Sequence, residues 1–180
     1  MTSTETAEKP ALSAEKADLL EALAQHRFFL RYTVRDLTDE QAKARTTVSE
    51  LCLGGLIKHV TAVERMWVDF IQEGPSAFPE FTEMTEEAQA QWAQRFRMAD
   101  GETLAGLLED YAEAGRRTDE VVAALPDLNG THPLPRAPWF EPGARRSARR
   151  VLLHIMAETA QHAGHADIIR ESLDGAKTMG

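Results

Sequence analysis

The sequence predicts an all-α protein, a four-helix bundle with a long loop before its last helix. Apolar residues recur at spacings of three and four through four long segments, which is the period of an amphipathic helix. No segment alternates apolar and polar residues over enough positions to indicate a β-sheet. Long amphipathic helices bury their apolar faces against one another, so a bundle is the fold that these segments favour.

The first long helix begins after a polar lead-in. Residues 1–12 are expected to be a flexible segment, residues 13–175 to form the bundle, and residues 176–180 to form a short tail. Ser13 is the predicted N-cap, because a serine side chain can accept a hydrogen bond from the first turn. Apolar positions at helical spacing continue to Leu37.

Capping residues also mark the next two helices. Thr38 and Gln41 have the spacing of a capping box, which opens a short turn of helix. Ser49 is the predicted N-cap of a second long helix, from Glu50 to about Gln72, which the following Gly-Pro pair ends. One stripe along this helix is apolar apart from a single histidine, and it consists of Cys52, Leu56, His59, Val63, Met66 and Phe70.

A proline-containing loop and a short helix are predicted before the third long helix. Residues 74–84 are predicted to be a loop, and residues 85–97 a short amphipathic helix. Asp100 is the predicted cap of a third long helix, which ends at Ala124 before a proline.

The long loop, residues 126–143, contains five of the eight prolines of the chain. A loop of this length inside a small domain is often functional. A fourth long helix is predicted from Ser147 to Leu173, with Gly175 placed to end it.

Composition excludes several classes of partner. The 180 residues include 20 Lys and Arg against 29 Asp and Glu, a net charge of −9, so the chain lacks the basic field of a nucleic-acid or lipid binder. No apolar run reaches the roughly 18 residues of a membrane span, and the N-terminus lacks the pattern of a signal peptide. The single cysteine, Cys52, excludes an intramolecular disulfide and suits a reducing cytoplasm. We expect a cytoplasmic protein that acts on a small molecule, with a homodimer as a candidate assembly.

The fourth helix carries most of the candidate chemistry. His154, Glu158, His162 and His165 fall within about 80° of one another around the helix, but the outer pair lies ~16 Å apart along its axis. Glu158 and His162 are one turn apart, as the two histidines of an HExxH motif are, so both can reach one ion. His59, in the apolar stripe of the second helix, is the candidate for the third ligand.

This set predicts a mononuclear metal site. A ferritin-like di-iron site would need glutamates three residues before His59 and His162, where the chain has Leu56 and Thr159. Two histidines and one carboxylate leave coordination positions open, as in a catalytic site. Zinc is the first choice, and nickel and Fe(II) stay open as alternatives. The competing interpretation is a buried core histidine together with a solvated i, i+4 pair.

Other residues have candidate roles around this site. His165, three residues after His162, is the candidate proton carrier. Four arginines lie between Arg145 and Arg150 in an otherwise acidic chain, and Arg149 and Arg150 are candidates to bind carboxylates of a thiol or a substrate. The alternative for these arginines is a solvated helix start. Cys52 is predicted to be a buried, inert thiol.

Two segments resemble a known family, LCLGGLIKHVTAVERMW (51–67) and HIMAETAQHAGHADIIRESLDG (154–175). They are similar to the DinB-like superfamily, in particular to an actinobacterial branch of small DinB family proteins, and the resemblance extends over residues 13–175. It implies a four-helix bundle with a metal bound by His59, Glu158 and His162. Many members have histidine in place of Glu158, whereas the mycothiol-dependent maleylpyruvate isomerases are similar to this chain in using glutamate.

The resemblance also implies an activity. Members with known activities are mostly S-transferases and isomerases that use a low-molecular-weight thiol, mycothiol or bacillithiol, as co-substrate. The isomerases carry an additional C-terminal domain, whereas this chain ends at Gly180, so we expect a stand-alone metal-dependent thiol S-transferase. Two alternatives stay open, a hydrolase that uses metal-bound water and a non-catalytic metal-binding helical module.

Overall fold

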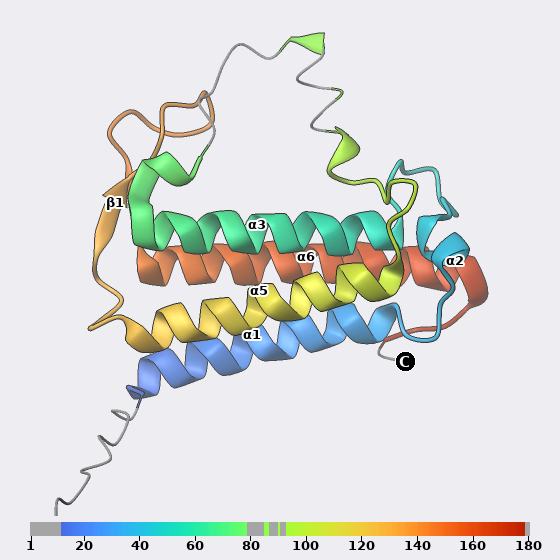
Figure 1. Ribbon diagram of the computed structural model, residues 1–180, viewed down its shortest axis with the longest axis horizontal. Helices are drawn as coiled ribbons and strands as arrows, with labels where there is room; N and C mark the ends of the chain where they lie inside the picture. The colour runs from blue at the N-terminus through green and yellow to red at the C-terminus, as the bar shows by residue number, and fades with distance from the viewer. Residues whose placement is uncertain (1–11, 79–84, 87–89, 91–92, 179–180) are drawn as a thin grey trace, which may run out of the picture.

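The computed structural model describes residues 12–78, 85, 86, 90 and 93–178, and it confirms the helical bundle. Four long helices lie side by side along the molecule (Figure 1): α1 (Ala14–Thr33), α3 (Leu53–Glu73), α5 (Leu104–Ala124) and α6 (Ala148–Asp174). Helices α1 and α6 run in one direction and α3 and α5 in the other, so the chain between α3 and α5 returns along the bundle. Two short elements, α2 (Asp39–Lys43) and η1 (Gly74–Ala77), lie in the connections.

The core consists of two apolar clusters, one towards each end of the bundle. One cluster is centred on Leu56 and Tyr111, and the other on Trp67 and Leu152. Burial of each such side chain contributes about 1.5–3 kcal/mol relative to an exposed one. Five of the ten buried polar or charged side chains in the described part of the chain lie near the junction of the two clusters: His59, Glu64, Thr118, Thr159 and His162.

Four of the predicted helix boundaries are confirmed by their capping groups. The side chain of Ser13 accepts from the N–H of Lys16, and both hydrogen bonds of the capping box at Thr38 are present. Ser147 accepts from the N–H of Arg150 at 3.2 Å. Gly175 ends α6 with a φ of 78°, in the left-handed region that favours glycine.

Two predicted caps are wrong, because a nearby residue takes the position. Helix α3 begins at Leu53 after Cys52, while the Ser49 hydroxyl accepts from the N–H of Leu51 in a bend. Helix α5 begins at Leu104 with Thr103 as its cap.

The side chain of Asp100 pairs instead with Lys43 at the end of α2. The first helix also ends earlier than Leu37, since the chain turns at Asp36, whose φ is 59°.

The long loop holds a small sheet that the sequence did not indicate. Strands β1 (Thr131–Pro133) and β2 (Arg145–Ser147) pair antiparallel, with His132 opposite Arg146. Strands of three residues are too short to show alternation in a sequence. The flexible segment predicted for residues 1–12 lies outside the described residues except for Leu12, and so does much of the helix predicted over 85–97.

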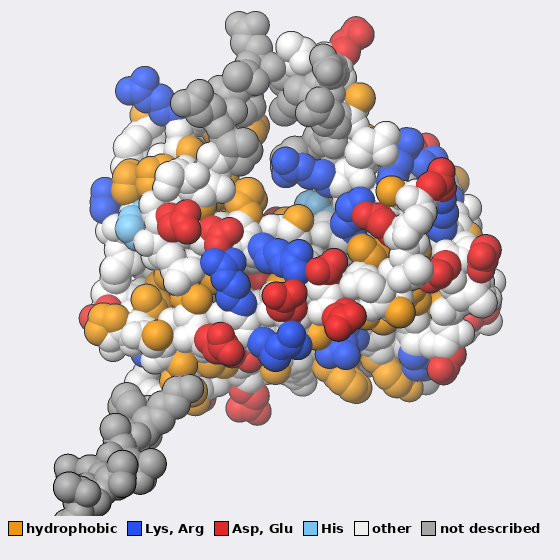
Figure 2. Space-filling model, in the orientation of Figure 1, with side chains coloured by type: hydrophobic (Ala, Val, Ile, Leu, Met, Phe, Trp, Pro, Cys, Tyr) orange, Lys and Arg blue, Asp and Glu red, His pale blue; other side chains and the backbone are white. Residues whose placement is uncertain are grey.

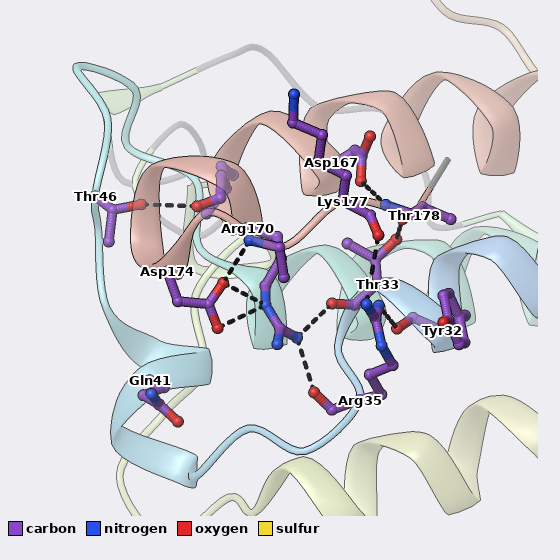
Figure 3. A network of polar contacts seen from close by, with 12 residues as sticks. Tyr32, Thr33, Arg35, Gln41, Thr46, Asp167, Arg170, Asp174, Lys177 and Thr178 are labelled. Carbon is purple, nitrogen blue, oxygen red and sulfur yellow. Dashed lines mark hydrogen bonds and ion pairs between the residues drawn. The ribbon is translucent and has the colours of Figure 1, made fainter. Parts of the chain in front are cut away.

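A network of polar contacts joins the end of α1 to α6 (Figure 3). The Arg170 guanidinium donates to the backbone carbonyls of Thr33 and Arg35, each at 2.8 Å, and pairs with Asp174 one turn further along α6. The Thr178 hydroxyl lies 2.6 Å from that of Thr33. The last residues of the described chain are thus tied to the C-terminal end of α1.

Charged side chains of both signs are interleaved on the face shown in Figure 2. Arg65 pairs with Asp110 and Arg117 with Asp69, so ion pairs join α3 to α5 across this face. None of the described helices is long and apolar enough to cross a membrane.

Candidate metal centre

The candidate ligands face one another across the contact between α3 and α6. In the described part of the chain, one group of three or more potential ligand side chains comes together, and it is His59, Glu158 and His162. Their ligand atoms all lie within 4.8 Å of one another. The group that the spacing predicts is therefore assembled by the fold, although it joins residues about a hundred positions apart.

The distances suit a single ion. Oε2 of Glu158 lies 3.7 Å from Nε2 of His59 and 3.6 Å from Nε2 of His162. Ligand atoms around a tetrahedral zinc, with bonds of about 2.1 Å, lie roughly 3.4 Å apart. Two imidazole nitrogens and one carboxylate oxygen are also a donor set that zinc, nickel and Fe(II) accept. These residues therefore fit a divalent ion with only small side-chain adjustments.

The burial of the two histidines and the negative charge of Glu158 favour the binding of a cation by this group. His59 and His162 are 7% and 8% exposed, whereas Glu158 is half-buried. The His162 and His59 imidazoles hold the pKa of the Glu158 carboxyl well below its usual range, although burial opposes this effect. A carboxylate that stays ionised beside two buried imidazole nitrogens is an effective cation ligand.

Two further histidines contact the ligands. Nδ1 of His165 lies 3.4 Å from Nδ1 of His162, the ring nitrogen that does not face Glu158. Nε2 of His154 lies 3.8 Å from Oε1 of Glu158. Burial, together with the charge of Arg146, lowers the pKa of His154. His165 can thus orient His162, and His154 can orient Glu158, without either histidine binding the ion. Such contacts to metal ligands tune metal affinity in proteins.

An aromatic ring from the connection between α3 and α5 covers one face of His59. The ring of Phe96 stacks on that of His59, with centroids 4.0 Å apart and planes inclined by 23°. This approach depends on Gly55, because a Cβ there would lie 1.9 Å from the carbonyl oxygen of Phe96. Phe96 is a site residue that the sequence pattern did not indicate, although the pair Gly54-Gly55 at the start of a helix is a signal of a close neighbour.

Replacing Gly55 with alanine is expected to disturb this arrangement. Alanine normally stabilises a helix relative to glycine by up to about 1 kcal/mol, but here the backbone at Phe96 must move. We expect a loss of about 1–3 kcal/mol of unfolding free energy and weaker metal binding.

Gly54→Ala is the matched control, because its nearest neighbour is the flexible Sδ of Met98. Thermal unfolding and metal titration of both variants provide the measurement. Equal behaviour of the two variants would contradict the role assigned to Gly55.

The structure separates the arginines that the sequence analysis grouped together. Arg149 forms a bidentate pair with Glu15 of α1 and also donates to Asn129, so its guanidinium is already engaged. These contacts do not support the prediction that Arg149 binds substrate. Arg150 is exposed, one turn before His154 on α6.

Other predicted features are also placed by the structure. Cys52 is buried at the start of α3, as predicted. Phe140 of the long loop packs against the Trp67 cluster, whereas Trp139 is 58% exposed. Trp92, in the helix predicted over residues 85–97, lies outside the described residues.

A protein-family model matches most of the chain. The family model described as mycothiol S-transferase matches residues 18–175, a range that includes α3, α5, α6 and all three candidate ligands. A search of curated proteins gives no match. The matched range confirms the DinB-like resemblance of the two quoted segments. The chain belongs to the mycothiol S-transferase family.

Proposed function

We propose that the protein is a metal-dependent transferase that activates the thiol of mycothiol for attack on an electrophilic small molecule. The observation that carries the proposal is the His59–Glu158–His162 group, within a chain whose family match covers residues 18–175. The family name supports the thiol, and the open coordination expected of three protein ligands supports catalysis. Zinc is the metal that we propose first.

Three side chains would hold the ion. His59 and His162 would each contribute Nε2, and Glu158 one carboxylate oxygen. When bound, the ion would hold the thiol sulfur and lower its pKa from the usual value of about 8.5, so that a thiolate forms at neutral pH. The negative charge of Glu158 would balance part of the charge of the cation.

The surrounding residues orient and protect the reacting groups. Phe96, stacked on His59, keeps water from one side of the ligand ring. His165 holds the far nitrogen of His162 and is the residue that we propose to receive the thiol proton. The thiolate sulfur then forms a bond to the electrophilic carbon. In a substitution the bond from that carbon to the leaving group breaks and the leaving group takes its electron pair, and in an addition the electron pair of the double bond moves to the neighbouring carbon. The proton passes to the leaving group or, in an addition, to the neighbouring carbon, so that atoms and charge balance.

We take the cytoplasm as the place of this reaction, because Cys52 and a thiol co-substrate both stay reduced there. A homodimer is the assembly that we propose.

Dependence on a thiol is the direct test of this proposal. Zinc-loaded protein mixed with an electrophile such as monochlorobimane should form the conjugate with mycothiol faster than the uncatalysed reaction does. Removal of the metal with a chelator should abolish the acceleration, because the proposed reaction relies on the ion to keep the thiol deprotonated. Conjugate formation can be followed by fluorescence.

The two alternatives predict other outcomes. A hydrolase would turn over an ester or amide with no thiol present, using bound water as nucleophile. A non-catalytic module would bind metal tightly but accelerate neither reaction. Either result would overturn the transferase.

A further inference from the structure

One arginine of the basic run, Arg146, is half-buried, and one nitrogen of its guanidinium has no hydrogen-bond partner in the described part of the chain. Arg146 lies in β2, where successive side chains point to opposite faces, and it points towards α3 while its neighbour Arg145 hydrogen bonds to Thr131. The Arg146 guanidinium lies 4.6 Å from the ring centroid of Trp67 and 5.4 Å from that of Phe140. Its Nη1 is buried and has no hydrogen-bond partner among the described groups. A guanidinium N–H group that has lost water without gaining an acceptor favours an anion that can accept from it.

A second guanidinium adds to the positive charge. Burial and the charge of Arg150 both lower the pKa of Arg146. Neither arginine forms an ion pair with a carboxylate in the described part of the chain. An anion held by both arginines would reduce the repulsion between them and accept the missing hydrogen bond of Arg146.

A row of side chains leads from the two arginines to the candidate metal centre. Arg150, His154 and Glu158 follow one another at intervals of one turn on α6, so Arg150 is ~12 Å from Glu158 along the axis. Trp67 connects Arg146 to the same row, since its ring centroid lies 4.8 Å from that of His154. His154 in turn contacts Glu158 at 3.8 Å. Long arginine side chains can therefore reach a group on a small molecule whose other end is at the ion.

We propose that Arg146 and Arg150 form a subsite for a carboxylate of the electrophilic substrate. The inference rests on the proposed transferase and names the class of its second substrate. The thiol itself is not the occupant, because mycothiol carries its cysteine as an N-acetylated amide of a sugar and has no carboxylate. The protein therefore favours electrophiles in which a carboxylate is separated from the reacting carbon by a short spacer.

A matched pair of electrophiles tests the selectivity. 4-(Chloromethyl)benzoate and 4-(chloromethyl)benzamide differ in the charge at one end and have the same reacting carbon. With mycothiol, and after correction for the uncatalysed rates, we expect kcat/KM to be at least about tenfold higher for the benzoate. In Arg146→Gln and Arg150→Gln the ratio should fall towards one through a higher KM for the benzoate. Arg145→Gln, which removes the same charge from a guanidinium engaged with Thr131, should keep the ratio.

Binding without turnover separates this inference from the proposed function. Calorimetry with 4-methylbenzoate should show saturable binding to the wild type and to Arg145→Gln. The same titration should show no binding to Arg146→Gln, whose fold is checked by its metal content and circular dichroism. Absence of binding to the wild type, or equal binding to Arg146→Gln, would overturn the subsite. Binding without any thiol-dependent turnover would support the subsite and overturn the transferase.

Discussion

His162→Ala is expected to lose metal and activity together. The variant keeps two of the three ligands, and loss of one protein ligand should weaken metal binding on the order of 100-fold or more. Elemental analysis after dialysis should find little metal, and thiol-dependent turnover should fall to the background. Chelation should also lower the melting temperature of the wild type by roughly 10 °C, because a ligand at about 1,000 times its Kd contributes about 4 kcal/mol. The variant should show almost no such shift.

His26→Ala is the matched control for this experiment. His26 lies on α1 and is not part of the His59–Glu158–His162 group, so the same chemical change there should leave metal content and turnover at wild-type values. Full metal occupancy in His162→Ala would place the ion elsewhere, at His154 or His165, and the proposed ligand set would be wrong.

The second large effect is expected at a buried ion pair in the middle of the bundle. Arg27 of α1 donates to both carboxylate oxygens of Glu64 on α3, which is 1% exposed, and also pairs with Asp119 of α5. Burial opposes the charge of Arg27, but Glu64 and Asp119 outweigh this effect and raise its pKa. Arg27→Met would leave a buried carboxylate with Thr118 as its remaining donor. We expect a loss of about 3–5 kcal/mol of unfolding free energy, measured by urea denaturation.

A double variant distinguishes the ion pair from simple loss of packing. Arg27→Met combined with Glu64→Leu removes both charges, and we expect it to recover most of the lost stability. Arg31→Met, on an exposed position of the same helix, should change stability by no more than about 0.5 kcal/mol. A double variant as unstable as Arg27→Met would show that the side-chain volume, and not the pairing of charges, matters at this position.

Features that depend on neighbours in the sequence could be predicted, and features that depend on distant contacts could not. The caps at Ser13, Thr38 and Ser147 use groups within three residues, so local pattern suffices. The start of α5 depends on a distant group, because the Asp39 carboxylate accepts from the N–H of Leu104. That contact favours Thr103 as the cap over Asp100.

The same distinction applies to the candidate metal centre. Glu158 and His162 are related by helical spacing, and His59 stands out as the one histidine in an apolar stripe, so all three could be predicted. Phe96 reaches His59 only because a segment between helices folds back onto α3. Arg146 could not be distinguished from Arg149, because the difference between them depends on the register of β1 with β2 and on where Glu15 lies.

The packing of α1 on α6 affects how the nascent chain folds during translation. Helix α1 leaves the ribosome first, but α6, against which it packs extensively, begins only at Ala148. The backbone carbonyls at the end of α1 likewise have no hydrogen bond from the Arg170 guanidinium until α6 has been synthesised. Contacts between such distant segments slow folding and leave apolar surface exposed in the meantime. We therefore expect the first three long helices to need protection by a chaperone until α6 has emerged.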